Sequence, residues 1–256
     1  MIDEQDIQRF LEDGAFTVDT PISTDRITAA AEALDRLLPQ KDGRPRSGAT
    51  CNYDDPALID LIQDSFFEQV ARHVLDSPAV YFFQTAIITT FPQPGVEFSF
   101  DQHVDTQYTL SDLDGSPRRL TCSFFLWLSD VAADQAPMMY RPGSHRPLAA
   151  HWETQTDLVD EIPRIIGIKL ADLPDLDYAE TQPLLAKAGQ VSVLTTGMVH
   201  GASVNTGDTP RKAMVITFHD VDVPVGLPEV QEVTKRKYDA MLRNILSPER
   251  RHIVRP

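Results

Sequence analysis

The chain has 256 residues, of which 42 % are hydrophobic, and this length and composition are typical of one domain with a sizeable core. Its net charge of −15 and its pI near 4.7 argue against a surface that follows nucleic-acid phosphates. No apolar run approaches the roughly 20 residues that cross a bilayer, and the acidic start lacks a signal-peptide pattern, so we expect a cytoplasmic protein that binds neither membrane nor nucleic acid.

The amino-terminal part, about residues 1–78, predicts helices. Apolar residues recur at helical spacing over 7–11, 27–38 and 56–74, and the third of these stretches begins with a proline that suits the first helical position. The run 41–48 combines Gly, Pro, Asp and basic residues, and it predicts a mobile loop between the second and third helices.

From residue 80 the pattern changes to short apolar segments separated by Pro, Gly and Asp, which is typical of antiparallel β-structure. The candidate strands are 80–91, 96–101, 107–110, 119–128, 137–141, 191–194, 199–204 and 212–221. Their number suits a mainly β protein with a double-stranded β-helix, the jelly roll of cupin-like proteins, over about 80–222. The stretch 148–188 shows no strand pattern, so we expect an insertion that partly covers the site as a lid. Helical spacing returns over about 228–246, which predicts a last helix on the outside of the barrel.

His103 and Asp105 are the most informative residues of the predicted β-structure. Side chains two apart on a strand point to the same side, so this pair can bind one metal ion. With seven His and 38 acidic residues, about one His-x-acid match is expected by chance. A second match does occur at 151–153, but it lies outside any convincing strand, and we expect it in the lid or on the surface. The first pair gains support from His200, because two histidines and one carboxylate form the triad that holds non-haem Fe(II) with open coordination positions.

The segment 197–218 predicts a hairpin that brings Arg211 beside His200. It reads as a strand ending near Val204, a turn rich in Asn, Gly, Asp and Pro, and a returning strand. A planar guanidinium can bind a carboxylate through two parallel hydrogen bonds. Arg211 is therefore expected to hold a dicarboxylate cosubstrate that also chelates the metal.

These pieces resemble the phytanoyl-CoA dioxygenase family of Fe(II)- and 2-oxoglutarate-dependent oxygenases. The order and spacing of His103-x-Asp105, the run 141–147 (Arg-Pro-Gly-Ser-His-Arg-Pro), His200 and Arg211 agree with the family over roughly residues 80–220. The resemblance implies that the two histidines and the aspartate bind Fe(II) and that Arg211 binds the distal carboxylate of 2-oxoglutarate. His145, within the Pro-Gly turn of 141–147, is expected to be structural.

The resemblance extends to two further candidate residues. Gln84 matches the position of a glutamine that faces the pocket in ectoine-hydroxylase-like members. Thr121 matches the strand that supplies a hydroxyl to 2-oxoglutarate, with Ser123 as the alternative donor. The residues after the metal carboxylate, 106–108, and Ala213 depart from the ectoine hydroxylases, which argues against that specific activity. Related halogenases lack the metal carboxylate that is present here, so oxidation at carbon is favoured over halogenation.

The resemblance thus predicts a dioxygenase that hydroxylates, or otherwise oxidises, a C–H bond of a small-molecule metabolite with O2 and releases succinate and CO2. Because histidines bind metal only in their neutral form, metal affinity is expected to fall at acidic pH. Three alternatives stay open: a barrel that binds a metal or small ligand without oxidising it, a cupin-like hydrolase or isomerase, and an oxygenase of protein side chains. A hydrolase or isomerase would not need Arg211, and a protein-modifying oxygenase would show an open groove. The sequence does not predict the substrate or the oligomeric state.

Overall fold

In the computed structural model, residues 2–105, 121–154, 168–169, 173–222 and 229–255 are described. The helices are α1 Glu4–Glu12, α2 Thr24–Leu37, α3 Pro56–Ile62, α4 Ser65–Val74, α5 His145–Glu153 and α6 Glu229–Ile245, followed by a 3-10 helix, Pro248–Ile253. The strands are β1 Ala15–Asp19, β2 Arg46–Thr50, β3 Val80–Thr90, β4 His103–Val104, β5 Thr121–Trp127, β6 Met138–Tyr140, β7 Ile168–Lys169, β8 Gln182–Leu184, β9 Gln190–Thr195, β10 His200–Ala202 and β11 Arg211–Asp220. None of the described helices is long and apolar enough to span a membrane.

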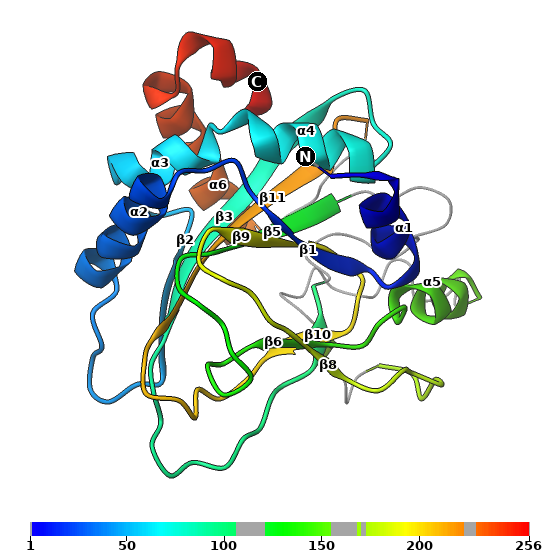
Figure 1. The fold of residues 1–256 in the computed structure, drawn as a ribbon. Coiled ribbons are helices and arrows are strands. Elements are labelled where there is room, and N and C mark those ends of the chain that lie inside the picture. The colour runs from blue at the N-terminus through cyan, green and yellow to red at the C-terminus, as the bar shows by residue number, and fades with distance from the viewer. Residues whose placement is uncertain (1, 106–120, 155–167, 170–172, 223–228, 256) are drawn as a thin grey trace.

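Two antiparallel sheets form the body of the molecule. The larger sheet has six strands in the order β1-β9-β5-β11-β3-β2, and the smaller has five in the order β7-β4-β10-β6-β8. Helices α2, α3, α4 and α6 lie on one side of the large sheet, and strands β6, β8 and β10 lie on its other side (Figure 1). This is the predicted jelly-roll arrangement with helices added at both ends of the chain, although no strand pairing of the described residues joins the two sheets into a closed barrel.

The alternation of side chains along the strands creates two hydrophobic cores. On β11, Met214, Ile216 and Phe218 contact the helices and belong to the helix-side core. Ala213 and Val215, which point the other way, belong to a smaller inter-sheet core. Both faces of the large sheet are therefore covered, and the cavity described below opens from the inter-sheet side.

The helical predictions need one correction. The stretch 56–74, predicted as one helix, contains two, because α3 ends at Ile62 and α4 begins at Ser65. Asp64 caps the second helix by accepting a hydrogen bond from the backbone N–H of Phe66, which starts a new helix instead of continuing the old one. The carboxy-terminal helix expected at 228–246 is α6, whose buried Tyr238 and Leu242 lie in the helix-side core.

Several strand predictions also differ from the structure. The segment 96–101 is not a strand, and only Phe100 makes an isolated bridge, to Ser203. The expected loop 41–48 is partly strand β2, at the edge of the large sheet. Strand β1 was not predicted, and the expected insertion 148–188 contributes β7 and β8 to the small sheet. The candidate strand 107–110 lies outside the described residues.

Candidate active site

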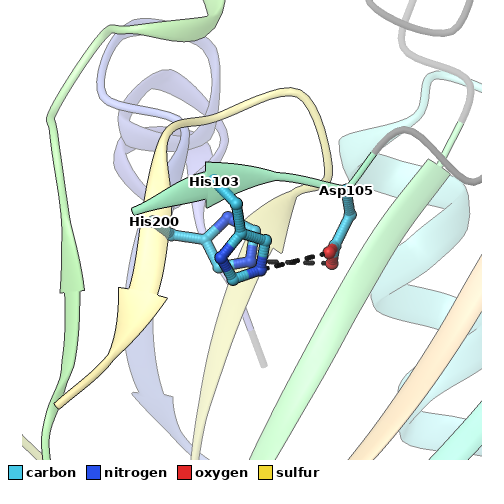
Figure 2. A group of neighbouring side chains, drawn as sticks. All are labelled: His103, Asp105 and His200. Carbon is cyan, nitrogen blue, oxygen red and sulfur yellow. Dashed lines mark ion pairs between the residues drawn. The ribbon is translucent and has the colours of Figure 1, made fainter. Parts of the chain in front are cut away.

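His103, Asp105 and His200 meet on the small sheet. His103 on β4 lies directly opposite His200 on β10, and Asp105 follows β4 by one residue. The Nε2 atoms of His103 and His200 lie 3.4 Å and 3.6 Å from the two carboxylate oxygens of Asp105. Figure 2 shows both rings turned toward this carboxylate. One potential ligand atom from each residue falls within 4.8 Å of the others, so the three can hold one metal ion.

Backbone contacts fix the orientation of this triad. The Nδ1 atom of His200 lies 2.8 Å from the carbonyl of Met198, so it carries the proton and Nε2 keeps its lone pair for a metal. The backbone N–H of Asp105 donates to the carbonyl of Thr196 at 3.1 Å. A Cβ atom at Gly201 would lie 1.5 Å from the carbonyl oxygen of Asp101, so only glycine allows β10 to approach the segment that leads into His103.

The three side chains are strongly coupled electrostatically. Burial alone raises the pKa of Asp105, but the neighbouring His200 and His103 reverse this effect and hold the pKa far below its ordinary value. Burial lowers the pKa of His200, whereas the Asp105 carboxylate raises it, and the resulting pKa lies above the ordinary value. The carboxylate is thus ionised throughout the physiological range, and protonation of His200 competes with the binding of a metal ion.

Arg211 supplies a buried positive charge to the same interior. Its side chain is 3 % exposed, donates from Nη2 to the hydroxyl of Thr90 at 2.7 Å and lies over the Trp127 ring at 5.6 Å. Its Nε has no hydrogen-bond partner, and no carboxylate of the described residues pairs with it. Burial, with a further contribution from Arg46, lowers the pKa of Arg211 to about 9. The guanidinium therefore lacks the counter-charge that a buried cation requires.

Arg211 and His200 are not connected by the predicted hairpin. Strand β10 belongs to the small sheet and β11 to the large one, so the two strands face each other and are not paired. The connection between them is held by Asn205, whose side-chain amide donates to the carbonyls of Thr90 and Thr209. His200 and Arg211 thus lie on opposite walls of one space.

That space is a cavity of about 480 Å³ between the sheets, to whose walls β2 and α6 also contribute residues. The triad, Arg211 and Gln84 all line it, and a concave pocket with a few convergent polar groups is typical of small-molecule sites. Its remaining walls are mainly apolar and include Ile87, Ile88, Phe125, Met138, Val215 and Val230.

Thr121 does not fit its predicted role beside Arg211. Its hydroxyl is buried and hydrogen-bonded to that of Thr196 at 2.6 Å, and it is not among the cavity-lining residues. It lies opposite His219, near the far end of the ten-residue β11 from Arg211. At about 3.3 Å per residue the two ends are roughly 25 Å apart, much farther than a small dicarboxylate reaches.

The alternative hydroxyl, Ser123, is likewise engaged, with Thr217 at 2.9 Å. The hydroxyl that accepts a hydrogen bond from Arg211 is that of Thr90, a residue that the sequence did not indicate. Arg46, a second arginine in the cavity, was missed as well. The sequence places Thr90 at the end of a long predicted strand, but it does not indicate that Arg211 lies opposite Thr90 in the sheet.

The Pro-Gly-Ser turn supports the triad without joining it. The Ser144 hydroxyl accepts a hydrogen bond from the backbone N–H of Val199, and the backbone N–H of Arg141 donates to the Val199 carbonyl. The turn thereby anchors the residue before His200. His145 is buried against the carbonyl of Leu11, away from the triad, as expected for a structural histidine. Of the second match, 151–153, the side chains after His151 lie outside the described residues.

Comparison with known proteins agrees with this geometry. The model of the phytanoyl-CoA dioxygenase (PhyH) family matches residues 10–213. An ectoine dioxygenase of Nocardia farcinica (strain IFM 10152) is 27 % identical over 207 residues, which are 77 % of this chain and 68 % of the relative. An ectoine dioxygenase of Bordetella bronchiseptica is 26 % identical over 68 % of this chain and 57 % of its own length.

Solved structures show the same fold. EvdO2 from Micromonospora carbonacea var. aurantiaca matches with a TM-score of 0.64 at 20 % identity, over 91 % of this chain and 96 % of that chain. HygX from Streptomyces hygroscopicus, solved with nickel and 2-oxoglutarate bound, matches with a TM-score of 0.62 at 14 % identity, over 88 % of this chain and 90 % of that chain.

The two facing sheets and the triad on the smaller one define a jelly-roll protein with a site of two histidines and one carboxylate. The family match covers most of the sequence and includes all three of these residues and Arg211. The chain belongs to the phytanoyl-CoA dioxygenase family and is, by class, a 2-oxoglutarate-dependent dioxygenase.

Proposed function

We propose that His103, Asp105 and His200 bind Fe(II), that Arg211 binds the distal carboxylate of 2-oxoglutarate, and that the protein oxidises a C–H bond of a small molecule. The residues present fit both groups. Two imidazoles and one carboxylate are the donor set of non-haem Fe(II) oxygenases. Arg211 is a buried cation with a free Nε and no counter-ion among the described residues, as an anion-binding arginine requires.

The uncompensated charge of Arg211 is the observation that carries the proposal. A metal-dependent hydrolase or isomerase would have no use for a buried, unpaired guanidinium on the wall opposite its metal. A 2-oxoglutarate-dependent oxygenase does need such a guanidinium, because its cosubstrate is a dianion. The structure of HygX with 2-oxoglutarate bound adds support from a protein of the same fold.

When bound, Fe(II) and 2-oxoglutarate supply the activation of O2 that oxidises the substrate, with release of succinate and CO2. The chain's own residues prepare the site for this chemistry. Met198 holds His200 in the metal-binding tautomer, and Thr90 holds the Arg211 guanidinium in place. The apolar walls exclude water, while Gln84 offers an amide to the substrate.

The size of the cavity favours a small-molecule substrate over a protein side chain. About 480 Å³ of space lies within the usual range for metabolite pockets. We propose hydroxylation, or another oxidation at carbon, since Asp105 occupies the position that related halogenases leave without a carboxylate. Ala213 stands where ectoine hydroxylases carry an asparagine, so the proposed substrate is a molecule other than ectoine.

The test is an anaerobic titration of the apoprotein with Fe(II) and 2-oxoglutarate, followed by the visible charge-transfer band of the complex. Wild type is expected to show the band, His103→Ala to lose it, and Arg211→Gln to need at least roughly tenfold more 2-oxoglutarate, because a charge-assisted bidentate contact is lost. Lys212→Ala is the matched control, since Lys212 pairs with Asp35 outside the cavity. A folded, metal-loaded wild type without the band would instead favour the barrel that binds a ligand without oxidising it.

A further inference from the structure

Strand β2 forms an open wall of the cavity. Its residues Arg46, Gly48 and Thr50 are exposed, whereas Ser47 and Ala49 between them are half-buried. All three exposed residues line the cavity, and so does Ala49. Because β2 is the edge strand of the large sheet, no further strand of that sheet covers its outer side.

Arg46 faces the same interior as Arg211. Both arginines lie opposite Thr90, one on each side of β3, and residues opposite one another in a sheet point to the same face. Arg46 is also close enough to Asp105 for the carboxylate to raise its pKa, against a larger lowering by desolvation. The Arg46 guanidinium therefore lies within electrostatic range of both the proposed iron site and the proposed cosubstrate site.

Arg46 is the unpaired cation of this wall. Of the cavity-lining cations in the described part of the chain, Lys235 is paired with Asp239 at 2.6 Å and lies over the rings of Phe82 and Phe83. Arg211 is assigned to 2-oxoglutarate. No hydrogen bond or ion pair of the Arg46 side chain is found within the described ranges.

When Fe(II) and 2-oxoglutarate are bound, no negative charge in the described part of the cavity balances the positive charge of Arg46. The two positive charges of Fe(II) and the two negative charges of 2-oxoglutarate cancel, and Asp105 cancels one of the two arginines. Since Asp239 balances Lys235, one positive charge is then left over among the described residues that line the cavity. A partly enclosed, unbalanced cation attracts an anion, and a guanidinium binds carboxylate or phosphate with particular geometric fit.

We propose that the substrate is a small acid, whose carboxylate or phosphate group is bound by Arg46 while its apolar body lies against the cavity wall near the triad. The inference rests on the proposed function. Gly48, two residues along the same face, has no side chain to obstruct a ligand that extends from Arg46 into the cavity. Ile88, Phe125 and Val215 provide the apolar surface for the rest of the molecule.

The experiment measures ligand-induced thermal stabilisation of the full chain loaded with Mn(II) and saturating 2-oxoglutarate, so that no turnover occurs. The probes are aliphatic and aromatic carboxylates and phosphate monoesters, each paired with its neutral methyl ester or alcohol. Acids, and not their neutral partners, are expected to stabilise the wild type. Arg46→Gln should need at least roughly tenfold more of the same acid, and Arg46→Lys should fall between the two. Arg44→Gln is the matched control, because this exposed arginine does not line the cavity.

A second measurement separates this inference from the proposed function. The 2-oxoglutarate titration with Fe(II) should weaken in Arg46→Gln by no more than about threefold, because the variant removes a neighbouring charge but no direct contact to the cosubstrate. A loss as large as that of Arg211→Gln would assign Arg46 to the cosubstrate and overturn the inference. Equal stabilisation by neutral partners, no effect of Arg46→Gln, or no binding of any acid would overturn it too. Absence of the charge-transfer band in wild type would refute the proposed function, whatever the acids do.

Discussion

Thr90 holds Arg211, the side chain that we propose binds the cosubstrate. Its hydroxyl accepts the hydrogen bond from Arg211, and this is the only hydrogen bond of the guanidinium that the described residues provide. Thr90→Val keeps the shape and removes the acceptor. A hydrogen bond to a charged group contributes about 1.5–3 kcal/mol, so the dissociation constant of 2-oxoglutarate is expected to rise at least about tenfold. The anaerobic charge-transfer titration measures it.

The neighbouring threonine is a control of the same size. The Thr89 hydroxyl is buried without a hydrogen-bond partner among the described residues, on the opposite face of β3. Thr89→Val should leave 2-oxoglutarate binding unchanged and stability equal or slightly higher, because an unsatisfied polar group is removed. Equal losses of affinity in the two variants would show that Thr90 acts on the strand as a whole and not on Arg211.

His219 gives the folded protein a dependence on pH. Burial, the largest cause, lowers the pKa of this 3 % exposed histidine to about 4, while the unfolded value is about 6.5. The unfolded chain therefore takes up the proton first as pH falls. The contribution to stability is complete above about pH 6.5 and is lost as pH falls toward 4.

Integration of this shift predicts a loss of about 2 kcal/mol of unfolding free energy between pH 7.5 and pH 5. Urea unfolding at the two pH values measures it. Other groups also titrate in this range, so wild type must be compared with His219→Gln. The loss of unfolding free energy between the two pH values should be about 2 kcal/mol smaller in the variant. The same acid sensitivity in both proteins would mean that His219 is readily protonated in the folded state.

Strand β10 tolerates no side chain at Gly201. The contact of 1.5 Å that a Cβ atom would make is with the backbone of Asp101, which no side-chain rotation relieves. Gly201→Ala must push apart β10 and the segment that leads to His103, and overpacking of this kind costs about 1–3 kcal/mol. We expect at least about 2 kcal/mol lower stability in urea and at least about tenfold weaker Mn(II) binding.

Gly207→Ala is the comparison for this prediction. It lies in the connection after β10, and its nearest neighbour would be the flexible side chain of Gln135 at 3.2 Å. Its effect should stay below about 1 kcal/mol, with metal binding intact. If Gly201→Ala bound Mn(II) as well as this variant does, the close approach of the two segments would not determine the ligand geometry.

The elements that the sequence predicts well are those whose own residues determine them. Strands β3, β5 and β11 are apolar runs rich in β-branched and aromatic residues, and they appear close to their predicted bounds. Strand β2, with the sequence Arg-Ser-Gly-Ala-Thr, has no such signal. It is a strand because its backbone pairs with β3, and that partner is distant in the sequence. The break between α3 and α4 was missed because the apolar stripe continues across the Asp64 cap.

The candidate site also has features that the local sequence predicts and features that only the tertiary structure determines. The same-side placement of His103 and Asp105 follows from the period of a strand, and the structure brings both to His200. The proximity of Arg211 was predicted for the wrong reason, since it results from two facing sheets and not from a hairpin. The register of β5 against β11, which separates Thr121 from Arg211, is a tertiary feature with no local sequence signal.

The cavity draws its walls from the whole length of the chain. Strand β2 comes from the amino-terminal part, α6 from the carboxy-terminal part, and the triad from two segments between them. The helix-side core joins α2, α4 and α6 to the large sheet, whereas β4 and β10, which carry His103 and His200, belong to the small sheet. The two parts are connected at the site, because the backbone N–H of Asp105 donates to the carbonyl of Thr196, just after β9 of the large sheet. The geometry of the proposed metal ligands therefore depends on contacts between the two sheets.

Metal binding should consequently stabilise the whole molecule. A ligand that binds only the folded state adds about 2.7 kcal/mol at a free concentration one hundred times its dissociation constant. For a chain of this size, that gain corresponds to a rise in Tm of about 5–10 °C. We expect this rise when Mn(II) is added to the apoprotein and its reversal when EDTA is added, as followed by circular dichroism. His200→Ala should show little or no shift, whatever its own starting Tm. A full shift in that variant would place the stabilising metal elsewhere in the protein and would remove His200 from the ligand set.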